Sequence, residues 1–134
     1  MIGRYPGDTY DGDLKDPAVQ GHPWVPCTCN FGQLYYNLAN AVSNSQSVPF
    51  DNLSAPFFNQ VNIQQNTSPA QAVANLQSAG DAMLNAMIFH SDHLELSEQF
   101  DRTSGFEKSV SDLTWSYAAF LSAVRAKTGS VVAG

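Results

Sequence analysis

Three segments of this 134-residue chain carry apolar side chains at intervals of three and four residues, and no segment alternates convincingly as a half-buried strand does. The first apolar stripe comprises Phe31, Leu34, Tyr35, Leu38, Ala41 and Val42. The second comprises Val73, Leu76, Met83, Leu84, Met87 and Ile88, and the third Leu113, Tyr117, Phe120, Leu121 and Val124. This pattern predicts an all-α fold of three to four helices with long loops, the fourth being a short helix within Pro56 to Val61.

Residue types at the ends of the stripes indicate where the helices begin. Thr28 or Asn30 is placed to cap the first helix, because a side-chain oxygen accepts N–H groups that the first turn leaves unpaired. Ser68 followed by Pro69 predicts the start of the second helix, since proline fits a first turn that needs no N–H there. Asp112 is the predicted cap of the last helix.

Glycine positions predict two further features of the helices. Gly80 lies on the apolar face of the second helix, which continues to about His90. It weakens that helix by about 1 kcal/mol relative to alanine but lets a neighbouring helix approach closely. The last helix is expected to end before Gly129, with Arg125 and Lys127 favourably placed near its C-terminus.

The segments between the stripes are rich in turn-forming residues. Residues 3 to 27 contain four prolines and are predicted to be loop, and a second loop runs from Ser43 to about Ala55. Long loops in a compact domain are more often functional than incidental. We therefore expect the loops to carry the functional site.

Charge and hydropathy exclude two classes of partner. The net charge is -6, and the six basic residues form no run, whereas a polyanion is bound by clustered Lys and Arg. No stretch approaches the roughly 18 consecutive apolar residues of a transmembrane helix. We expect binding to neither nucleic acid nor membrane.

Cysteines and histidines offer no clear reactive or metal site. Cys27 and Cys29 are too close for an ordinary disulfide and one residue short of a redox Cys-x-x-Cys motif. We interpret Cys27 as a buried apolar residue near a helix start, and Cys29 as a candidate partner for a cysteine outside this chain. The histidines, which are His22, His90 and His93, include an i, i+3 pair near a helix end. With no third ligand clearly placed, that pair is interpreted as polar surface, and no metal is predicted.

A carboxylate motif and an aromatic motif follow one another near the end of the chain. Glu98 lies in Ser97 to Asp101, between a helix end and a helix start, and Trp115 lies in Asp112 to Ala119, at the next helix start. A carboxylate in that position can face a cleft, and an aromatic ring can give the cleft an apolar floor. Such sites suit sugars.

Together with Gly3 to Tyr10, these motifs resemble the C-terminal part of the catalytic domain of fungal glucoamylases, the inverting glucan 1,4-alpha-glucosidases of glycoside hydrolase family 15. The resemblance runs from Arg4 to about Arg125. Two departures concern the rim of the sugar site. The loop from Asp11 to His22 is longer than expected, and Gly7 stands where an acidic residue is common.

The resemblance implies that residues 1–134 are a fragment of one catalytic domain, without a starch-binding domain. The family fold is an (α/α)6 toroid of six inner and six outer helices, and four helices cannot close that ring. We expect an incomplete toroid whose exposed apolar faces associate with one another or with the missing N-terminal part of the domain.

By the same resemblance, Glu98 is the catalytic base. Inverting hydrolysis needs one carboxylic acid to protonate the leaving oxygen and one carboxylate to activate water on the opposite face of the sugar. The family's acid comes from an earlier part of the domain and has no match here. We therefore expect the isolated chain to be nearly inactive, and we interpret Glu95 as a solvated side chain.

The resemblance also implies a set of contacts to an α-glucan such as starch or a maltooligosaccharide. Arg4 is expected to bind sugar hydroxyls, to pair with Asp8 at the loop, or both. The residues expected along the acceptor side, with a core position as the alternative, are Tyr5, Tyr10 and Trp24. Trp115 lies beside the first sugar subsite and Leu113 supplies a backbone carbonyl there. Acid–base hydrolysis of an acetal implies no cofactor.

Secretion is expected for the full-length enzyme. Asn52 and Asn66 begin N-glycosylation sequons in a segment that we expect to be exposed. The start of this chain lacks the basic and apolar regions of a secretory signal, so we expect a missing upstream segment.

Two other interpretations stay open at this stage. In the first, the chain is a noncatalytic helical protein, derived by truncation, that binds saccharide or a partner chain. In the second, it is an unrelated secreted helical bundle whose motif matches are accidental.

Overall fold

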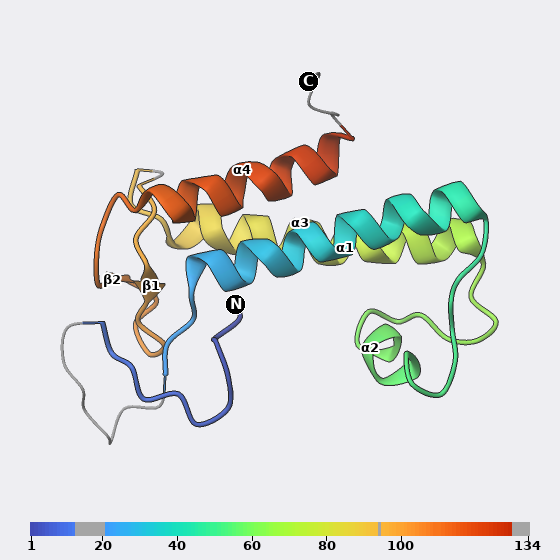
Figure 1. Ribbon diagram of the computed structural model, residues 1–134, viewed down its shortest axis with the longest axis horizontal. Coiled ribbons are helices and arrows are strands. Elements are labelled where there is room, and N and C mark those ends of the chain that lie inside the picture. The colour runs from blue at the N-terminus through green and yellow to red at the C-terminus, as the bar shows by residue number, and fades with distance from the viewer. Residues whose placement is uncertain (13–20, 94, 130–134) are drawn as a thin grey trace.

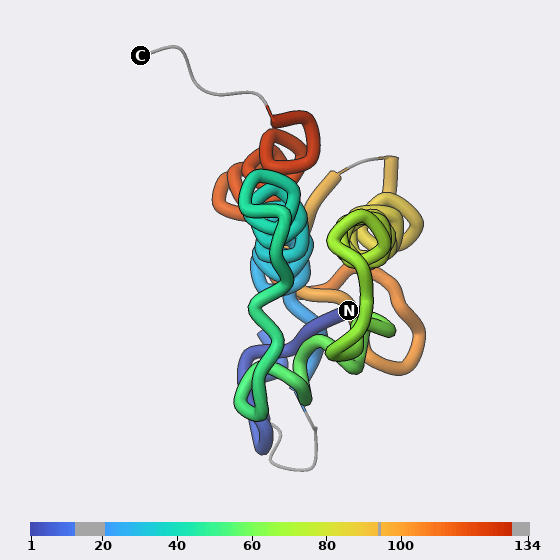
Figure 2. The backbone as a smooth tube through the Cα atoms, turned by 90° about the vertical axis from the view of Figure 1, so that its right-hand side faces the viewer, coloured from blue at the N-terminus to red at the C-terminus, as the bar shows by residue number. Residues whose placement is uncertain are grey.

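The computed structural model describes residues 1–12, 21–93 and 95–129. Most of them form four α-helices, which are α1 (Val25–Ser45), α2 (Ala55–Asn59), α3 (Pro69–His90) and α4 (Thr114–Thr128). Helix α1 packs against both α3 and α4, which touch each other little, so α1 is the centre of the three long helices (Figures 1 and 2). The prediction of a helical fold with three to four helices and long loops is confirmed.

The loops gather at the two ends of this layer (Figure 1). The N-terminal loop and a small hairpin lie where α1 begins, and α2 with its flanking loops lies toward the other end. A buried cluster underlies each end. The cluster beside the hairpin comprises Val25, Cys29, Tyr36, Leu84, Met87, Leu96, Phe100 and Ala123. The cluster beside α2 comprises Tyr35, Ala39, Val42, Phe58, Val61, Ile63, Ala72 and Leu76.

Gly80 allows the close helix approach that the sequence predicts. A Cβ atom built on Gly80 would lie 2.7 Å from the ring of Tyr36 on α1, which is closer than packed atoms allow. The Tyr36 hydroxyl donates to Asp81 at 2.6 Å, and Lys127 of α4 pairs with the same carboxylate at 2.7 Å. This one point therefore joins α1, α3 and α4.

The start of α1 was predicted wrongly. The helix begins at Val25 instead of near Phe31, with Pro26 in its first turn. Because proline fits a first turn, Pro26 belongs to the helix and not to the preceding loop. Neither predicted cap is used: Thr28 is buried inside the helix, where its hydroxyl accepts the backbone N–H of Ile2 at 2.9 Å.

The predicted ends of α3 and α4 are mostly confirmed. Ser68 caps α3 by accepting the N–H of Gln71, and Gly129 ends α4 in a left-handed conformation. The Asp112 cap is wrong. Leu113 holds the cap position of α4, and Asp112 has a positive φ of 53° and accepts the Tyr117 hydroxyl at 2.7 Å.

Two short strands had no sequence signal. Strand β1 (Gln99–Phe100) pairs antiparallel with β2 (Glu107–Lys108). Two residues are too few for a detectable alternation. An isolated bridge between Trp24 and Gln99 fastens the hairpin to the start of α1.

The burial of the two cysteines is the reverse of the prediction. Cys29 is fully buried in the core, where burial raises its pKa to about 12, whereas Cys27 is only partly buried. Both thiols are free. Complete burial of Cys29 leaves no access for a cysteine from another chain, so the buried apolar role belongs to Cys29.

The asparagines of both sequons lie at the surface. Asn52 and Asn66 are both exposed, as glycosylation requires, and the modification itself stays a prediction. Among the described residues, no helix combines the length and apolar character needed to cross a bilayer.

Candidate active site

The N-terminal loop folds around an ion pair between Arg4 and Asp8. Both oxygens of the Asp8 carboxylate accept guanidinium N–H groups, at 2.8 Å from Nε and 2.7 Å from Nη2. Asp8 is buried, and hydrogen bonding from Arg4 holds its pKa below the ordinary range. Gly7 supplies the left-handed turn between them, with a φ of 81°. This left-handed conformation favours glycine, which accounts for the residue at position 7.

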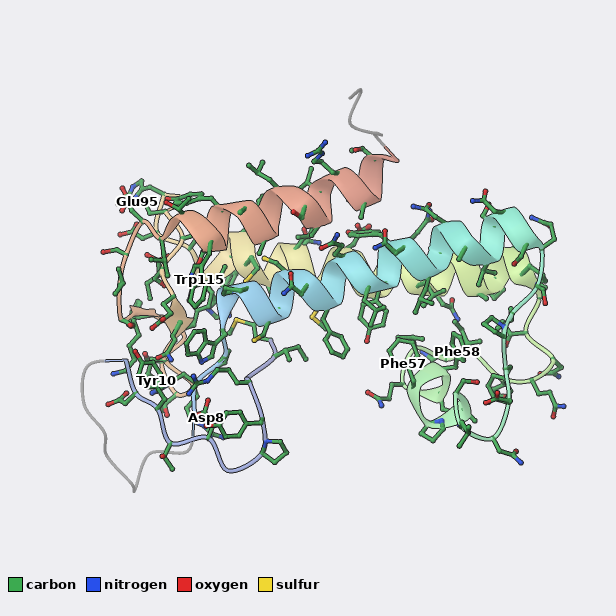
Figure 3. All side chains as sticks on the ribbon, in the orientation of Figure 1. Asp8, Tyr10, Phe57, Phe58, Glu95 and Trp115 are labelled. Carbon is green, nitrogen blue, oxygen red and sulfur yellow. The ribbon has the colours of Figure 1, made fainter. Side chains whose placement is uncertain are left out.

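Arg4 also stacks against aromatic residues of the site. Asp8, Tyr10 and Trp115 lie at the same end of the molecule (Figure 3). The guanidinium carbon of Arg4 lies 4.5 Å from the ring centroid of Trp24, 4.9 Å from that of Tyr10 and 5.4 Å from that of Tyr5. The predicted pairing of Arg4 with Asp8 is present. Arginine has five N–H donors, and within the described part of the chain Asp8 takes two of those of Arg4, which leaves three for another acceptor.

Three aromatic rings connect Arg4 with the start of α4. Tyr10 and Trp24 have ring centroids 5.7 Å apart, and Trp24 meets Trp115 edge to face at 6.0 Å. Trp24 is 5% exposed and belongs to the core, which is the predicted alternative to a position along the acceptor side. Trp115 is 51% exposed and Tyr5 is 61% exposed, so these two rings offer open apolar surface.

Glu98 is held by backbone hydrogen bonds on both sides. Its N–H donates to the carbonyl of Val110 at 2.8 Å, and its carbonyl accepts the N–H of Val25 at 3.1 Å. The side chain is 8% exposed. Carboxylate oxygen Oε2 accepts the hydroxyl of Ser109 at 2.6 Å and that of Tyr10 at 3.5 Å. Tyr10 therefore links the Glu98 carboxylate to the Arg4 stack.

Ser109 is a site residue that sequence reasoning missed. It lies just after β2 with a positive φ of 70°, and only the hairpin brings it opposite Glu98. Gly12 passes so close that a Cβ there would lie 2.5 Å from the Cβ of Ser109. Gly12 and Ser109 are about a hundred residues apart in the chain. A contact over that separation leaves no signal in a single sequence.

His22 is a second site residue that no local sequence pattern identified. It is buried, with Nε2 2.8 Å from Asp11 and Nδ1 accepting the N–H of Arg102 at 3.1 Å. Nε2 therefore carries the proton that Asp11 accepts. Lys108 pairs with the same carboxylate at 2.9 Å, and hydrogen bonding from Lys108 and then His22 lowers the pKa of Asp11.

Leu113 is positioned next to the site, but its carbonyl is engaged. It accepts N–H groups from Ser116 at 2.8 Å and Tyr117 at 3.3 Å in the first turn of α4. A carbonyl oxygen has two lone pairs, so a sugar hydroxyl there competes with the helix. The predicted sugar contact of Leu113 stays a prediction.

Two buried polar groups near Glu98 lack a hydrogen-bond partner among the described residues. They are the indole N–H of Trp24 and the side-chain amide of Gln99. Unpaired buried donors are costly and often coincide with functional positions. Most of the long loop between Asp11 and His22 lies outside the described residues.

A cavity of about 400 Å³ opens beside Arg4. Its walls include Tyr5, Asp8, His22 and Arg102, and neither Glu98 nor Trp115 lines it. Arg4, Glu98 and Trp115 are thus joined through Tyr10 and Trp24 and do not share the walls of this cavity. Among the described residues, no three His, Cys, Asp or Glu side chains are grouped to hold a metal ion.

The candidate carbohydrate site consists of a carboxylate, an arginine and exposed aromatic rings. They lie on the loops and helix starts at one end of the helical layer (Figure 1). The protein-family model described as "Glycosyl hydrolases family 15" matches residues 1–125. The chain therefore belongs to glycosyl hydrolases family 15.

Named relatives agree with this assignment. The chain is 31% identical to Glucoamylase 1 of Rhizopus oryzae over 98% of its own length and 23% of that protein's length. It is 33% identical to Glucoamylase GLA1 of Saccharomycopsis fibuligera over 92% of its length and 27% of that protein's. This chain spans about a quarter of these relatives.

Solved structures agree as well. The structure of a glucoamylase from Saccharomycopsis fibuligera superposes with a TM-score of 0.81 at 30% identity, covering 96% of this chain and 30% of that one. The glucoamylase of Hormoconis resinae gives a TM-score of 0.78 at 27% identity, covering 96% of this chain and 22% of that one. The predicted fold class, an incomplete (α/α)6 toroid, is confirmed.

Proposed function

We propose that this chain is the C-terminal part of the catalytic domain of an inverting glucoamylase, with Glu98 as the general base. The whole domain releases beta-glucose from the ends of alpha-1,4-linked glucans such as starch. The carrying observation is the contact of the Glu98 carboxylate with Ser109 and Tyr10, whose ring stacks on Arg4. A nearly buried carboxylate is thus linked through Tyr10 to an arginine, which supports the proposal.

The geometry suits a base that orients a water molecule. Ser109 donates to Oε2 at 2.6 Å, and the Tyr10 hydroxyl lies between Oε2 at 3.5 Å and the Gly12 carbonyl at 3.4 Å. The Ser109 bond fixes the carboxylate, and in this proposal Oε1 accepts a proton from water. The water then attacks the anomeric carbon from the face opposite the departing sugar. The acid that protonates the leaving oxygen is expected from another part of the domain, so the isolated chain is nearly inactive.

The remaining site residues bind the glucan in this proposal. Arg4 donates to sugar hydroxyls with the N–H groups that Asp8 does not use, and Asp8 fixes the guanidinium. Tyr5 and Trp115 cover apolar faces of glucose units. Tyr10 and Trp24 stack on the Arg4 guanidinium and hold it in place. Leu113 caps the start of α4 beside the first subsite.

Secretion of the full-length enzyme is part of the proposal. The exposed asparagines of both sequons support it. One relative, from Saccharomyces cerevisiae, is named as an intracellular, sporulation-specific glucoamylase, and that location is said of that protein alone. Glycosylation of Asn52 and Asn66 after expression through a secretory pathway is the direct check.

Mixing this chain with the N-terminal remainder of a relative's catalytic domain tests the function. We expect starch hydrolysis to appear only in the mixture. Glu98→Gln should lower it about 100- to 10,000-fold, as loss of a general base does. The exposed Glu95→Gln is the matched control and should have no effect.

The same mixture distinguishes the noncatalytic alternative. Glucan binding without turnover by a correctly assembled mixture would favour a truncated binding protein. Unchanged turnover in Glu98→Gln would instead contradict the assigned base.

A further inference from the structure

Three segments of the chain meet at the buried carboxylate of Asp11. Its oxygen Oδ1 accepts the Nε2–H of His22 at 2.8 Å and pairs with Nζ of Lys108 at 2.9 Å. Asp11 comes from the N-terminal loop, His22 from the residues just before α1, and Lys108 from β2. We call these three residues the Asp11 cluster.

The residues on either side of Asp11 both contact the surroundings of Glu98. The Tyr10 hydroxyl lies 3.5 Å from Glu98 Oε2. Gly12 lies so close to Ser109 that a Cβ built on it would be 2.5 Å from the Ser109 Cβ. Consecutive Cα atoms are about 3.8 Å apart, so a shift of Asp11 moves both neighbours. The position of Asp11 therefore decides where the N-terminal loop meets the carboxylate.

The hairpin reaches the same carboxylate through the residue after Lys108. That residue, Ser109, donates its hydroxyl to Glu98 Oε2 at 2.6 Å. The ion pair of Lys108 with Asp11 joins the hairpin to the N-terminal loop. Glu98 therefore lies between two segments that the Asp11 cluster fastens together.

His22 connects the cluster to the turn of the hairpin. Its ring is 3% exposed, and Nδ1 accepts the backbone N–H of Arg102 in that turn at 3.1 Å. Asp101 lies 3.9 Å from the same nitrogen. The imidazole ring is rigid, so one nitrogen that accepts and one that donates hold the turn and Asp11 at a fixed separation. His22 is thus placed to fix the N-terminal loop against the hairpin.

The contacts that hold Arg4 do not involve the Asp11 cluster. Both guanidinium hydrogen bonds go to Asp8. Gly21 packs on Asp8 from the other side, where a Cβ would lie 2.7 Å from the Asp8 Cβ, and its N–H donates to the Asp8 carbonyl. Sugar binding through Arg4 should therefore survive a change in the cluster.

We propose that His22 is a positioning residue for the general base, acting through Asp11 and Lys108. This inference rests on the proposed function of Glu98. Taking charges out of water is costly, and buried ion pairs are weak evidence for stability, so fixed geometry is the better reason for this cluster. Loss of the hydrogen bond between His22 and Asp11 lets the loop shift against the hairpin, and small misplacements of catalytic groups are costly in rate.

Two substitutions at His22 separate its two hydrogen bonds. In His22→Gln the amide nitrogen takes the place of Nε2 and still donates to Asp11. In His22→Asn the shorter amide presents an oxygen in the place of Nδ1, so it keeps the Arg102 contact and loses Asp11. In the domain assembled with its N-terminal remainder, His22→Asn should lower kcat for maltoheptaose about tenfold or more, with KM changed less than about twofold. His22→Gln should keep kcat within about threefold of the wild type.

Asp11 gives a second route to the same contacts. Asp11→Asn keeps an acceptor for His22 but removes the charge that pairs with Lys108, and it should also lower kcat at nearly constant KM. Both substitutions interrupt one series of contacts, so His22→Asn combined with Asp11→Asn should lose little more than the worse single variant. The matched control is His93→Gln, since His93 is an exposed histidine paired with the exposed carboxylate of Asp92, and it should leave kcat unchanged.

Carbon-13 NMR of the chain as it stands tests the positioning without turnover. With labelled glutamate, the carboxyl carbon signal of Glu98 is the one that disappears in Glu98→Gln. This signal should shift in His22→Asn and stay in place in His22→Gln and His93→Gln. Circular dichroism confirms that each variant is folded.

Only this pattern supports the inference. Wild-type kcat in a folded His22→Asn variant would overturn it, as would equal losses in His22→Asn and His22→Gln or losses that multiply in the double variant. If His22→Asn does not fold, wild-type kcat in Asp11→Asn overturns the inference equally. An assembled wild-type domain that does not hydrolyse maltoheptaose counts against the proposed function instead, and the carboxyl signal of Glu98 then decides the role of His22 by itself.

Discussion

Glu98 depends on Ser109 for its orientation. The 2.6 Å hydrogen bond from the Ser109 hydroxyl is the shortest contact of the carboxylate with another side chain, and Tyr10 makes a longer one at 3.5 Å. A base must be held in line with its water, because small misplacements of catalytic groups are costly in rate. The serine is thus a positioning residue, not one that touches substrate.

Ser109→Ala is expected to lower turnover about ten- to a hundredfold in the mixture with the rest of the domain. The substitution removes the hydroxyl and leaves the Glu98 side chain held by Tyr10 alone. Steady-state kinetics should show the loss mainly in kcat. Ser111→Ala, an exposed serine in the same loop, is the control. Equal losses in both variants would mean that the loop matters and the hydrogen bond does not.

Asp8 should make stability depend on pH in the acid range. Its pKa is lowered in the folded state by hydrogen bonding from Arg4, so the folded state releases this proton more readily than the unfolded chain. The stabilisation is fully present above the ordinary carboxyl pKa, near 4, and is lost as pH falls through the lower folded value.

Asp8→Asn is therefore expected to destabilise the chain by about 1–3 kcal/mol at pH 7, since it leaves Arg4 without its partner. Denaturant unfolding at a series of pH values should show the two proteins converging as pH falls below about 4. A constant difference between pH 7 and pH 2 would show that the ion pair does not account for the loss.

Among the elements, the contact of α1 with α3 is the one most sensitive to side-chain size. Tyr36 covers Gly80 so closely that a methyl group has no room. Alanine raises helix propensity by about 1 kcal/mol, but overpacking a core costs about 1–3 kcal/mol. We expect overpacking to prevail because the Tyr36 hydroxyl is fixed by Asp81 and the ring cannot withdraw.

Gly80→Ala should accordingly lower the free energy of unfolding despite the gain in helix propensity. Ser78→Ala, at an exposed position on the same helix, gains propensity without a clash and should be neutral or stabilising. Thermal unfolding of both variants followed by circular dichroism is the measurement. A higher Tm for Gly80→Ala would show that α1 moves aside.

The predictability of the elements follows their length. Helices α3 and α4 are long and periodic, and their apolar faces and most of their ends were predictable from the sequence. The hairpin was not, because each strand has two residues. The family motifs identified Glu98, Arg4 and Trp115 as candidates, but the partners Ser109 and His22 depend on contacts between distant loops, which no local pattern encodes.

At the scale of the whole molecule, the chain is a segment of a larger ring. Several large apolar side chains are exposed on the helices, including Ile88 on α3 and Leu121 on α4. A small apolar cavity between these helices is lined by Ile88, Leu96, Tyr117 and Phe120. Contiguous exposed apolar surface of this kind favours association. We propose that the rest of the domain covers it.

The isolated chain is expected to self-associate, and the N-terminal remainder of the domain should convert it into a one-to-one complex. Sedimentation velocity measures both states. Ile88→Ser combined with Leu121→Ser should reduce self-association and also weaken the complex. A chain that stays monomeric and does not bind the remainder of the domain would argue against this role for the apolar faces.

The central claim is that Glu98 activates the water that attacks the sugar. The most direct measurement is proton NMR of the first product formed from maltoheptaose by the assembled domain. The account predicts beta-glucose from the wild-type chain, almost no product from Glu98→Ala, and beta-glucosyl azide from Glu98→Ala when azide replaces the activated water. Alpha-glucose as the first product, or undiminished hydrolysis by Glu98→Ala, would contradict it.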